Sequence, residues 1–258
     1  MNAGAVLMIA QRDLLKLLRD RARLVSELVF PMIFIGVLGS SLQANLGGAV
    51  GYDLLTFTFT GAVGMTIFQT TALGIVSLIE DRENDFSQEI FVSPVSRYAI
   101  VFGKILGETL VAAPVAIGIV AFAALLGVPL DGPRLAALAV TGLAAAFFGG
   151  AFGIVVLANL RSQRAANQVF PFIMLPQYFL AGIFNPIAVL PWYLDIVSRI
   201  SPMRYAVDLM RGGYYAGSPE ADRVVLADPM TNFAIMAAGF VVFMAVGTAL
   251  FVRAERNR

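Results

Sequence analysis

The chain has 258 residues, of which 59% are hydrophobic and 14% are charged, and its mean hydropathy is +0.80. A soluble domain carries about 45–50% apolar and about 25% charged residues, so this composition excludes a soluble domain and indicates an integral membrane protein. The net charge of +1 argues against nucleic acid as a partner. The sequence contains no Cys and no His, which excludes thiolate and imidazole chemistry and most metal ligation.

Residues 5–23 are predicted to form an amphipathic helix that lies in the membrane interface. One helical stripe is apolar and contains Leu7, Ala10, Leu14, Leu17 and Leu18. The opposite stripe is charged and contains Arg12, Asp13, Lys16, Arg19 and Asp20. The alternative is a solvated segment that merely leads into the first span.

Six stretches are long and apolar enough to cross a membrane, which takes about 17–25 residues in a helix. They cover residues 24–46, 54–79, 100–126, 134–158, 166–187 and 230–252. Pro31 in the first span is tolerable if neighbouring groups satisfy the freed carbonyl, whereas Pro171 and Pro176 predict a kink or a break in the fifth. The expected fold class is therefore an all-α membrane protein whose single domain is residues 1–258.

The distribution of basic residues places both termini in the cytoplasm, because cytoplasmic loops are rich in Lys and Arg. With that orientation, the inner segments contain Arg12, Lys16, Arg19, Arg21, Arg23, Arg82, Arg97, Lys104, Arg161, Arg164, Arg253, Arg256 and Arg258. The outer segments contain only Arg134, Arg199, Arg204, Arg211 and Arg223. We therefore expect a multi-pass protein of the plasma (inner) membrane.

Two connecting segments are unusual. The inner segment has five acids and one Arg between Glu80 and Glu89, together with a ridge formed by Phe86, Ile90 and Phe91. Such a ridge suits a short helix that docks in a groove of another protein, which we favour over a solvated loop. The outer segment, about 188–229, is predicted to contain two short helices that dip into the outer leaflet, or else a small extracellular domain.

The order of these features resembles the permeases of type-2 ATP-binding-cassette (ABC) exporters. The resemblance rests on the acidic stretch, on SPVSRYAIVFGK at 93–104, on the six spans and on NPIAVLPWYLDIVSRISPMRYAVDLMRG at 185–212. It implies a coupling helix at about 82–92 that seats in an ATPase through Glu83, Asp85, Phe86, Glu89, Ile90 and Phe91. It also implies an interfacial helix with Arg12, Lys16 and Arg19, and outer re-entrant helices at 188–215 with gate residues Pro191, Trp192, Pro202 and Arg204.

The nucleotide site is expected on a separate subunit. The chain lacks the G-x-x-x-x-G-K-[ST] loop, since Tyr98 stands at the position of its first Gly and Ile105 at that of its hydroxyl residue. ATP and Mg would belong to that ATPase partner, and this chain would carry no cofactor, metal or catalytic residue. The resemblance further implies pairing with a second copy or a paralogue.

Polar groups inside spans are candidates for the substrate pathway. Glu108 could have this role or could pair with Lys104 four residues earlier, and we weigh the two equally. Gln69 and Gln177 could line a polar path, although interhelical hydrogen bonds are favoured for each. Phe172 could face the pathway or the partner, and contact with lipid is at least as good an explanation. We expect an Arg23–Glu27 pair as well, and close helix contacts at Gly103/Gly107 and Gly149/Gly153.

The sequence thus predicts the membrane subunit of an ATP-driven exporter of an amphipathic drug, lipid or glycan. An ion-gradient-driven secondary transporter is the main alternative, but it leaves the acidic segment unexplained. A membrane-embedded enzyme is weaker still. Its best carboxylate cluster, Asp195, Asp208, Glu220 and Asp222, is explained as well by ion pairing.

Overall fold

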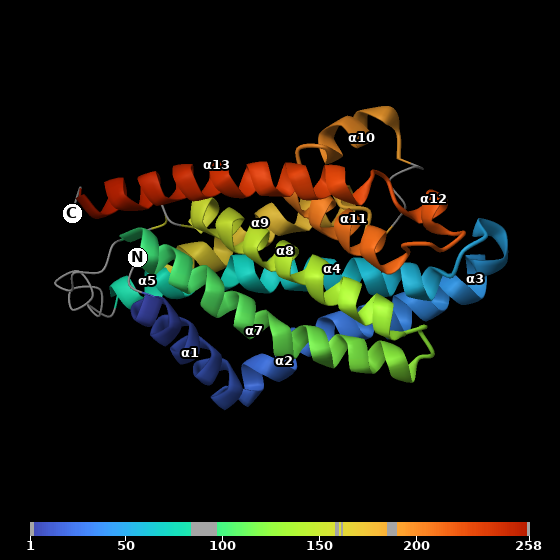
Figure 1. The fold of residues 1–258 in the computed structure, drawn as a ribbon, viewed down its shortest axis with the longest axis horizontal. Coiled ribbons are helices and arrows are strands. Elements are labelled where there is room, and N and C mark those ends of the chain that lie inside the picture. The colour runs from blue at the N-terminus through green and yellow to red at the C-terminus, as the bar shows by residue number, and fades with distance from the viewer. Residues whose placement is uncertain (1–2, 84–96, 158–159, 161, 185–189, 257–258) are drawn as a thin grey trace.

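The computed structural model describes residues 3–83, 97–157, 160, 162–184 and 190–256. Every regular element in these ranges is helical, which confirms the all-α fold class. The helices form an elongated bundle whose two termini lie at the same end (Figure 1). The opposite end carries α3 (Ser40–Val50) and α12 (Ala221–Val224).

The chain starts with α1 (Ala3–Arg19), which ends before Asp20. The first span then consists of α2 (Arg21–Ile33), a π-helical turn at Phe34–Gly39 and α3. Pro31 lies in α2, three residues before the π turn begins at Phe34. The backbone nitrogen of Phe34 donates to the carbonyls of both Phe30 and Pro31 where the π turn begins.

The centre of the bundle is α4 (Leu54–Gly74), which packs against α8 (Gly132–Leu157), α7 (Arg97–Leu125) and α11 (Pro202–Tyr214). Most residues of α4 are buried, although the helix is rich in threonine, and α5 (Val76–Glu83) continues the chain after it. The hydroxyls donate to carbonyls of their own helix, from Thr58 to Leu54 at 2.7 Å and from Thr71 to Ile67 at 3.0 Å. The helix therefore satisfies its own polar side chains and can be covered on all sides.

Two long helices, α7 (Arg97–Leu125) and α8 (Gly132–Leu157), follow as a hairpin. At Gly149 and Gly153 of α8, an added Cβ would lie 2.4 Å from the backbone oxygens of Phe68 and Ala72 in α4. The expected close contact at these glycines is confirmed, because a larger residue would hold the two helices apart. The last helix, α13 (Pro229–Arg256), packs along α8 and returns to the end of the bundle that holds the termini (Figure 1).

Five helical segments in the described residues are long and apolar enough to span a membrane: Arg21–Val50, Leu54–Glu80, Ala99–Leu125, Gly132–Leu157 and Pro229–Phe251. The predicted fifth span corresponds to α9 (Gln163–Leu180), which is not among them. Its sequence is interrupted by polar residues, including Gln168 and Gln177. This helix is continuous through Pro171 and Pro176, so the break considered from the sequence is not present.

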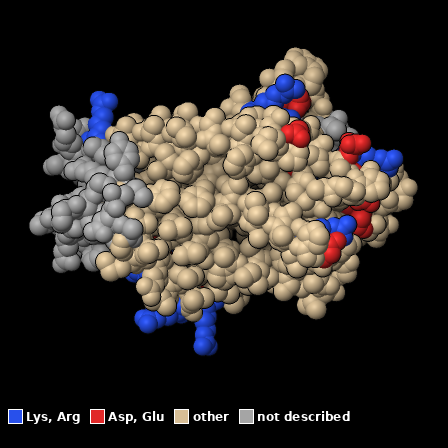
Figure 2. Space-filling model, in the orientation of Figure 1, with Lys and Arg blue, Asp and Glu red and all other residues tan. Residues whose placement is uncertain are grey.

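Two short helices, α10 (Trp192–Ser198) and α11 (Pro202–Tyr214), follow the segment after α9. Most of α11 is buried, and it packs against α4, α8 and α13, so it belongs to the bundle rather than to a separate domain. Acidic and basic side chains gather near the α3 and α12 end and at the edges of the visible face, while its middle has none (Figure 2). This distribution fits a protein whose middle lies in lipid.

Candidate functional site

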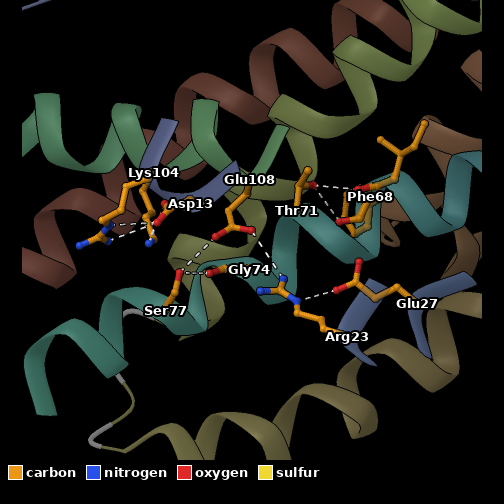
Figure 3. A network of polar contacts seen from close by, with 11 residues as sticks. Asp13, Arg23, Glu27, Phe68, Thr71, Gly74, Ser77, Lys104 and Glu108 are labelled. Atoms are coloured by element: carbon orange, nitrogen blue, oxygen red, sulfur yellow. Dashed lines mark hydrogen bonds and ion pairs between the residues drawn. The ribbon is translucent and has the colours of Figure 1, made fainter. Parts of the chain in front are cut away.

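A network of buried charged groups lies where α1 packs on α7 (Figure 3). Lys104 Nζ is 2.8 Å from Asp13 Oδ2, and the two side chains are only 1% and 5% exposed. Asp13 was expected on the polar, exposed stripe of the N-terminal helix, and that prediction is wrong. Lys16 and Arg19 are exposed, as an interfacial helix requires.

Two glycines of α7 explain why α1 can bring a carboxylate so close. A Cβ at Gly103 would lie 3.3 Å from the Cα of Val6, and a Cβ at Gly107 would lie 3.2 Å from the Cα of Ala10. The expected close contact at this pair is confirmed, and its partner is α1. The buried stripe of α1 consists of Val6, Ala10, Asp13 and Leu17, whereas Leu7 and Leu18 are exposed. The face in contact with α7 is therefore rotated from the predicted one, because the glycines determine which side of α1 fits.

One turn after Lys104, Glu108 contacts two other helices. Its Oε1 accepts a hydrogen bond from Ser77 Oγ at 3.2 Å, and its Oε2 is 4.0 Å from a guanidinium nitrogen of Arg23. Arg23 also pairs with Glu27 at 2.8 Å, which confirms the predicted ion pair. A Cβ at Gly74 would fall 1.9 Å from Glu108, so the carboxylate occupies space that only glycine leaves free.

The network thus connects α1, α2, α5 and α7 at the end of the bundle that holds the termini. Charge pairs interact strongly where water is excluded, and an unpaired member of such a pair is costly. Polar contacts therefore link α1 and α5 to α7, so a displacement of α1 or α5 would also displace α7. We call this cluster of Asp13, Arg23, Ser77, Lys104 and Glu108 the joint.

The other polar pathway candidates make contacts between helices. Gln69 Oε1 accepts a hydrogen bond from Tyr178 at 2.7 Å, which joins α4 to α9. Gln177 Oε1 lies 3.3 Å from the backbone nitrogen of Met203 and accepts its hydrogen bond at the start of α11. Both geometries fit the interhelical role favoured from the sequence. Phe172 is 80% exposed and points out of the bundle.

A series of phenylalanine rings borders the outward surface to which Phe172 points. Phe34 in the first span packs edge-to-face on Phe184 at 5.1 Å between ring centroids, and Phe184 stacks on Phe179 at 4.8 Å. Phe30 stacks on Phe34 from the other side, at 6.1 Å. Phe30 and Phe179 are exposed, so the surface shared by the first span and α9 remains apolar and uncovered in a single chain.

The outer gate candidates lie around α10. Pro191 caps the start of this helix, Trp192 is 76% exposed and Pro202 is the first residue of α11. Arg204 donates to Asp195 Oδ1 at 3.0 Å and so ties α11 to α10. Hydrogen bonds from Arg199 and Arg204 lower the pKa of the Asp195 carboxyl below its ordinary value.

Two further charged residues of α11 are buried, and sequence reasoning assigned them no such role. The Arg211 guanidinium lies 3.7 Å from the ring centroid of Phe57 and donates to the Gly182 carbonyl at 2.8 Å. Asp208 accepts from the backbone nitrogens of Leu226 and Ala227 at 2.9 and 3.0 Å. It also accepts from the amide of Asn232 in α13, at 2.7 Å. Asp208 and Arg211 are three residues apart on α11, next to the apolar residues Val207, Leu209 and Met210, and this spacing is the signal that could have revealed them.

Most of the predicted coupling residues lie outside the described part of the chain. Asp85, Phe86, Glu89, Ile90 and Phe91 belong to residues 84–96, which the structure does not describe. Glu83 is the last residue of α5.

Comparisons with known proteins agree with this architecture. The model of the ABC-2 type transporter family matches residues 4–215, and the chain belongs to this family. The inner membrane transport permease YadH of Escherichia coli K12 is 21% identical over 237 residues, which cover 91% of this chain and 89% of YadH.

Two other relatives align with smaller shares of this chain. The transport permease ycf38 of Cyanophora paradoxa is 23% identical over 211 residues, covering 79% of this chain and 71% of ycf38. Nodulation protein J of Rhizobium meliloti is 24% identical over 192 residues, covering 74% of this chain and 73% of that protein. The chain is thus a transport permease of the membrane, and the predicted family is confirmed.

Proposed function

We propose that this chain is the transmembrane subunit of an ATP-driven exporter in the inner membrane. Two copies, or one copy and a paralogue, would form the translocation pathway, and a separate ATPase would bind ATP and Mg. The observation that carries the proposal is the buried joint between α1 and α7 in a chain of the ABC-2 family. A permease whose ATPase is a separate polypeptide needs such a rigid connection between its cytoplasmic surface and its membrane spans.

The proposed mechanism moves helices as rigid bodies. Closure of the ATPase would displace the coupling helix at 82–92, whose first two residues are the last two of α5. Ser77 of α5 and Arg23 of α2 both contact Glu108, so this displacement would reach α7 and α2 together. Packed interfaces switch between discrete arrangements rather than stretching, and the pathway would open as a result.

We further propose six crossings, with α9 as the fifth. Helix α8 ends near the termini, and α13 begins at the opposite end of the bundle, so the chain must cross between them (Figure 1). Helix α9 contacts α5 at one end and α10 and α11 at the other. At about 1.5 Å per residue its 18 residues reach about 27 Å, close to the thickness of the hydrocarbon core. Cysteines at Ser87 and Gly217 should then react with impermeant reagents from opposite sides, and labelling from one side would contradict the count.

Dimerisation would cover the apolar surface of the first span and α9, including Phe30, Phe172 and Phe179. Their exposure in the single chain supports this arrangement, since large exposed apolar patches are typical of interaction sites. An amphipathic drug, lipid or glycan is the proposed substrate class.

The decisive experiment is purification of the tagged chain from its native membranes in a mild detergent. We expect a cytoplasmic protein with a G-x-x-x-x-G-K-[ST] loop to co-purify in stoichiometric amount. A permease that purifies alone after crosslinking in intact cells would overturn the proposal and favour a transporter driven by an ion gradient.

A further inference from the structure

The outward face of α9 carries a continuous stripe of exposed side chains whose chemistry changes along the helix. The buried face of the same helix consists of Ala166, Phe170, Met174 and Gln177. The exposed stripe consists of Arg164, Gln168, Phe172, Leu175 and Phe179. Intervals of four, four, three and four residues place these five side chains on one side of an α-helix. They therefore form one surface that a single elongated molecule can contact.

The first third of the stripe is polar and positively charged. Arg164 is the second residue of α9, and Asn167 and Gln168 lie in the following turn. All three side chains are exposed, and none has an ion-pair or hydrogen-bond partner among the described residues. The helix contains no Asp or Glu that could offset the guanidinium charge. Donors without a partner at the edge of a membrane span are available to an acceptor from outside the chain.

The remainder of the stripe is apolar. Phe172, Leu175 and Phe179 are 80%, 57% and 55% exposed. At about 1.5 Å per residue, this apolar part begins about 12 Å beyond Arg164 along the helix axis and continues for about 10 Å more. Because α9 begins on the side of the bundle that holds the termini, the cation and the amides lie at that side and the apolar part extends away from it (Figure 1). A molecule that matches this surface has a hydrophilic head and an apolar tail.

The proposed pairing of two copies determines the charge of that head. In a two-fold pair, the same surface of both copies meets. The surface formed by the first span and α9 would face its own copy, so two Arg164 guanidinium groups would approach the same mouth of the pathway. Like charges repel strongly where water is scarce, and an anion between them would remove this repulsion. The amides of Asn167 and Gln168 would donate further hydrogen bonds to that anion.

We propose that the substrate is an anionic amphiphile, whose acidic head binds Arg164, Asn167 and Gln168 while its apolar tail lies along Phe172 and Phe179. This inference rests on the proposed function, because it takes α9 to line the pathway between two copies. It narrows the substrate class considerably. A cationic drug would be repelled by Arg164, and a glycan without a lipid would leave the apolar part of the stripe without a contact.

The test uses the full chain in nanodiscs of phosphatidylcholine and dodecyl phosphate with a photoreactive diazirine in its tail. Matched probes carry the same tail on a trimethylammonium or a maltoside head. Irradiation crosslinks each probe, and mass spectrometry identifies the labelled residues. We expect the phosphate probe to label residues 168–179, with competition from unlabelled dodecyl phosphate. The other two probes should label this stripe no more than they label the other lipid-facing helices.

The variants assign the binding to the guanidinium. Arg164→Gln should raise the half-saturating concentration of the phosphate probe about tenfold or more, as loss of a charged hydrogen bond does. Arg164→Lys should keep most of the binding, because it retains the charge. Arg253→Gln is the matched control, since Arg253 is an exposed residue near the end of α13, on the same side of the bundle, and it should leave the labelling unchanged (Figure 1).

Three results would overturn the anionic substrate: equal labelling by all three head groups, absence of competition, or wild-type labelling in Arg164→Gln. Failure of the proposed function is detected separately. A preparation that retains its ATPase but shows one of these three results overturns the anionic substrate alone. Saturable labelling of a chain that purifies without any ATPase supports the binding site and contradicts the ATP-driven exporter. In the complex with the ATPase, dodecyl phosphate should stimulate ATP hydrolysis, and Arg164→Gln should abolish this stimulation.

Discussion

The two ends of the bundle bury charged groups in different ways. At the end with the termini, side chains of opposite charge meet across helices, as in Asp13 with Lys104 and Arg23 with Glu27 and Glu108. In α11, Asp208 is satisfied by backbone nitrogens and an amide, and Arg211 by a carbonyl and an aromatic ring. The first arrangement joins separate helices to one another. The second holds one short helix in a fixed place against the loops around it.

The largest expected effect is at the buried ion pair. Lys104→Met removes the Lys104 partner of the buried Asp13 carboxylate, which keeps Arg12 at 3.2 Å. Loss of one member of a buried pair costs about 3–5 kcal/mol of folding free energy, and the contact with Arg12 should reduce this cost. Thermal unfolding in detergent should show a much lower midpoint than the wild type. The double variant Asp13→Leu with Lys104→Met should recover most of this loss. A double variant as unstable as the single one would show that Asp13 and Lys104 do not stabilise the fold as an ion pair.

The second-largest effect is expected at Asp208 of α11, whose carboxylate accepts hydrogen bonds from backbone nitrogens. Asp208→Ala leaves the part-buried Leu226 and Ala227 nitrogens without this acceptor, and the Asn232 amide keeps only its longer bond to the Ala227 carbonyl, at 3.4 Å. A buried polar group left unsatisfied costs about 1–3 kcal/mol. Hydrogen exchange of residues 226–232 should increase, while the α1–α7 contact stays protected. A uniform increase over the whole chain would contradict the independence of the two ends.

A third variant separates stability from coupling. Gly74→Ala forces the Glu108 side chain to move, because the new methyl would lie 1.9 Å from its carboxylate. We expect a moderate drop in stability, about 1–3 kcal/mol as for overpacking, and weaker transmission from the ATPase. Gly48→Ala is the control, since nothing lies within 4 Å of a Cβ there. Stimulated ATPase activity equal in both variants would argue against the joint.

The coupling segment should affect activity without affecting the fold. Glu83→Ala combined with Phe86→Ala should leave the chain folded in detergent but abolish stimulation of the ATPase. A double variant that still stimulates fully would exclude residues 82–92 as the coupling helix.

The smallest effect is expected at the partly exposed Asp195. Its pKa is lowered by Arg199 and Arg204, so the interaction is present above the ordinary carboxyl pKa and is lost as pH falls through the lowered value. Asp195→Asn should therefore match the wild type in strongly acidic buffer and be slightly less stable at neutral pH. Exposed ion pairs contribute about 0–1 kcal/mol. Equal unfolding midpoints at both pH values would show that the pair contributes nothing.

The sequence predicted the helical class, the family and the position of the apolar helices, because long runs of apolar residues and ordered motifs are local signals. It also predicted the Arg23–Glu27 pair, which follows from helical spacing. It missed the burial of Asp13, because that depends on two glycines far away in the chain. The orientation of α1 is set by what Gly103 and Gly107 leave room for, and no periodicity within α1 reports this.

The buried pair between α1 and α7 has a consequence for biogenesis. The N-terminal helix leaves the ribosome well before the third span, and until then Asp13 lacks its ion pair with Lys104 and has Arg12, 3.2 Å away, as its partner. Charged groups are costly inside lipid, so we expect α1 to remain at the membrane surface while the first two spans insert. Docking of α1 then becomes a late step, and a chain stalled before Lys104 should leave its first helix accessible to protease.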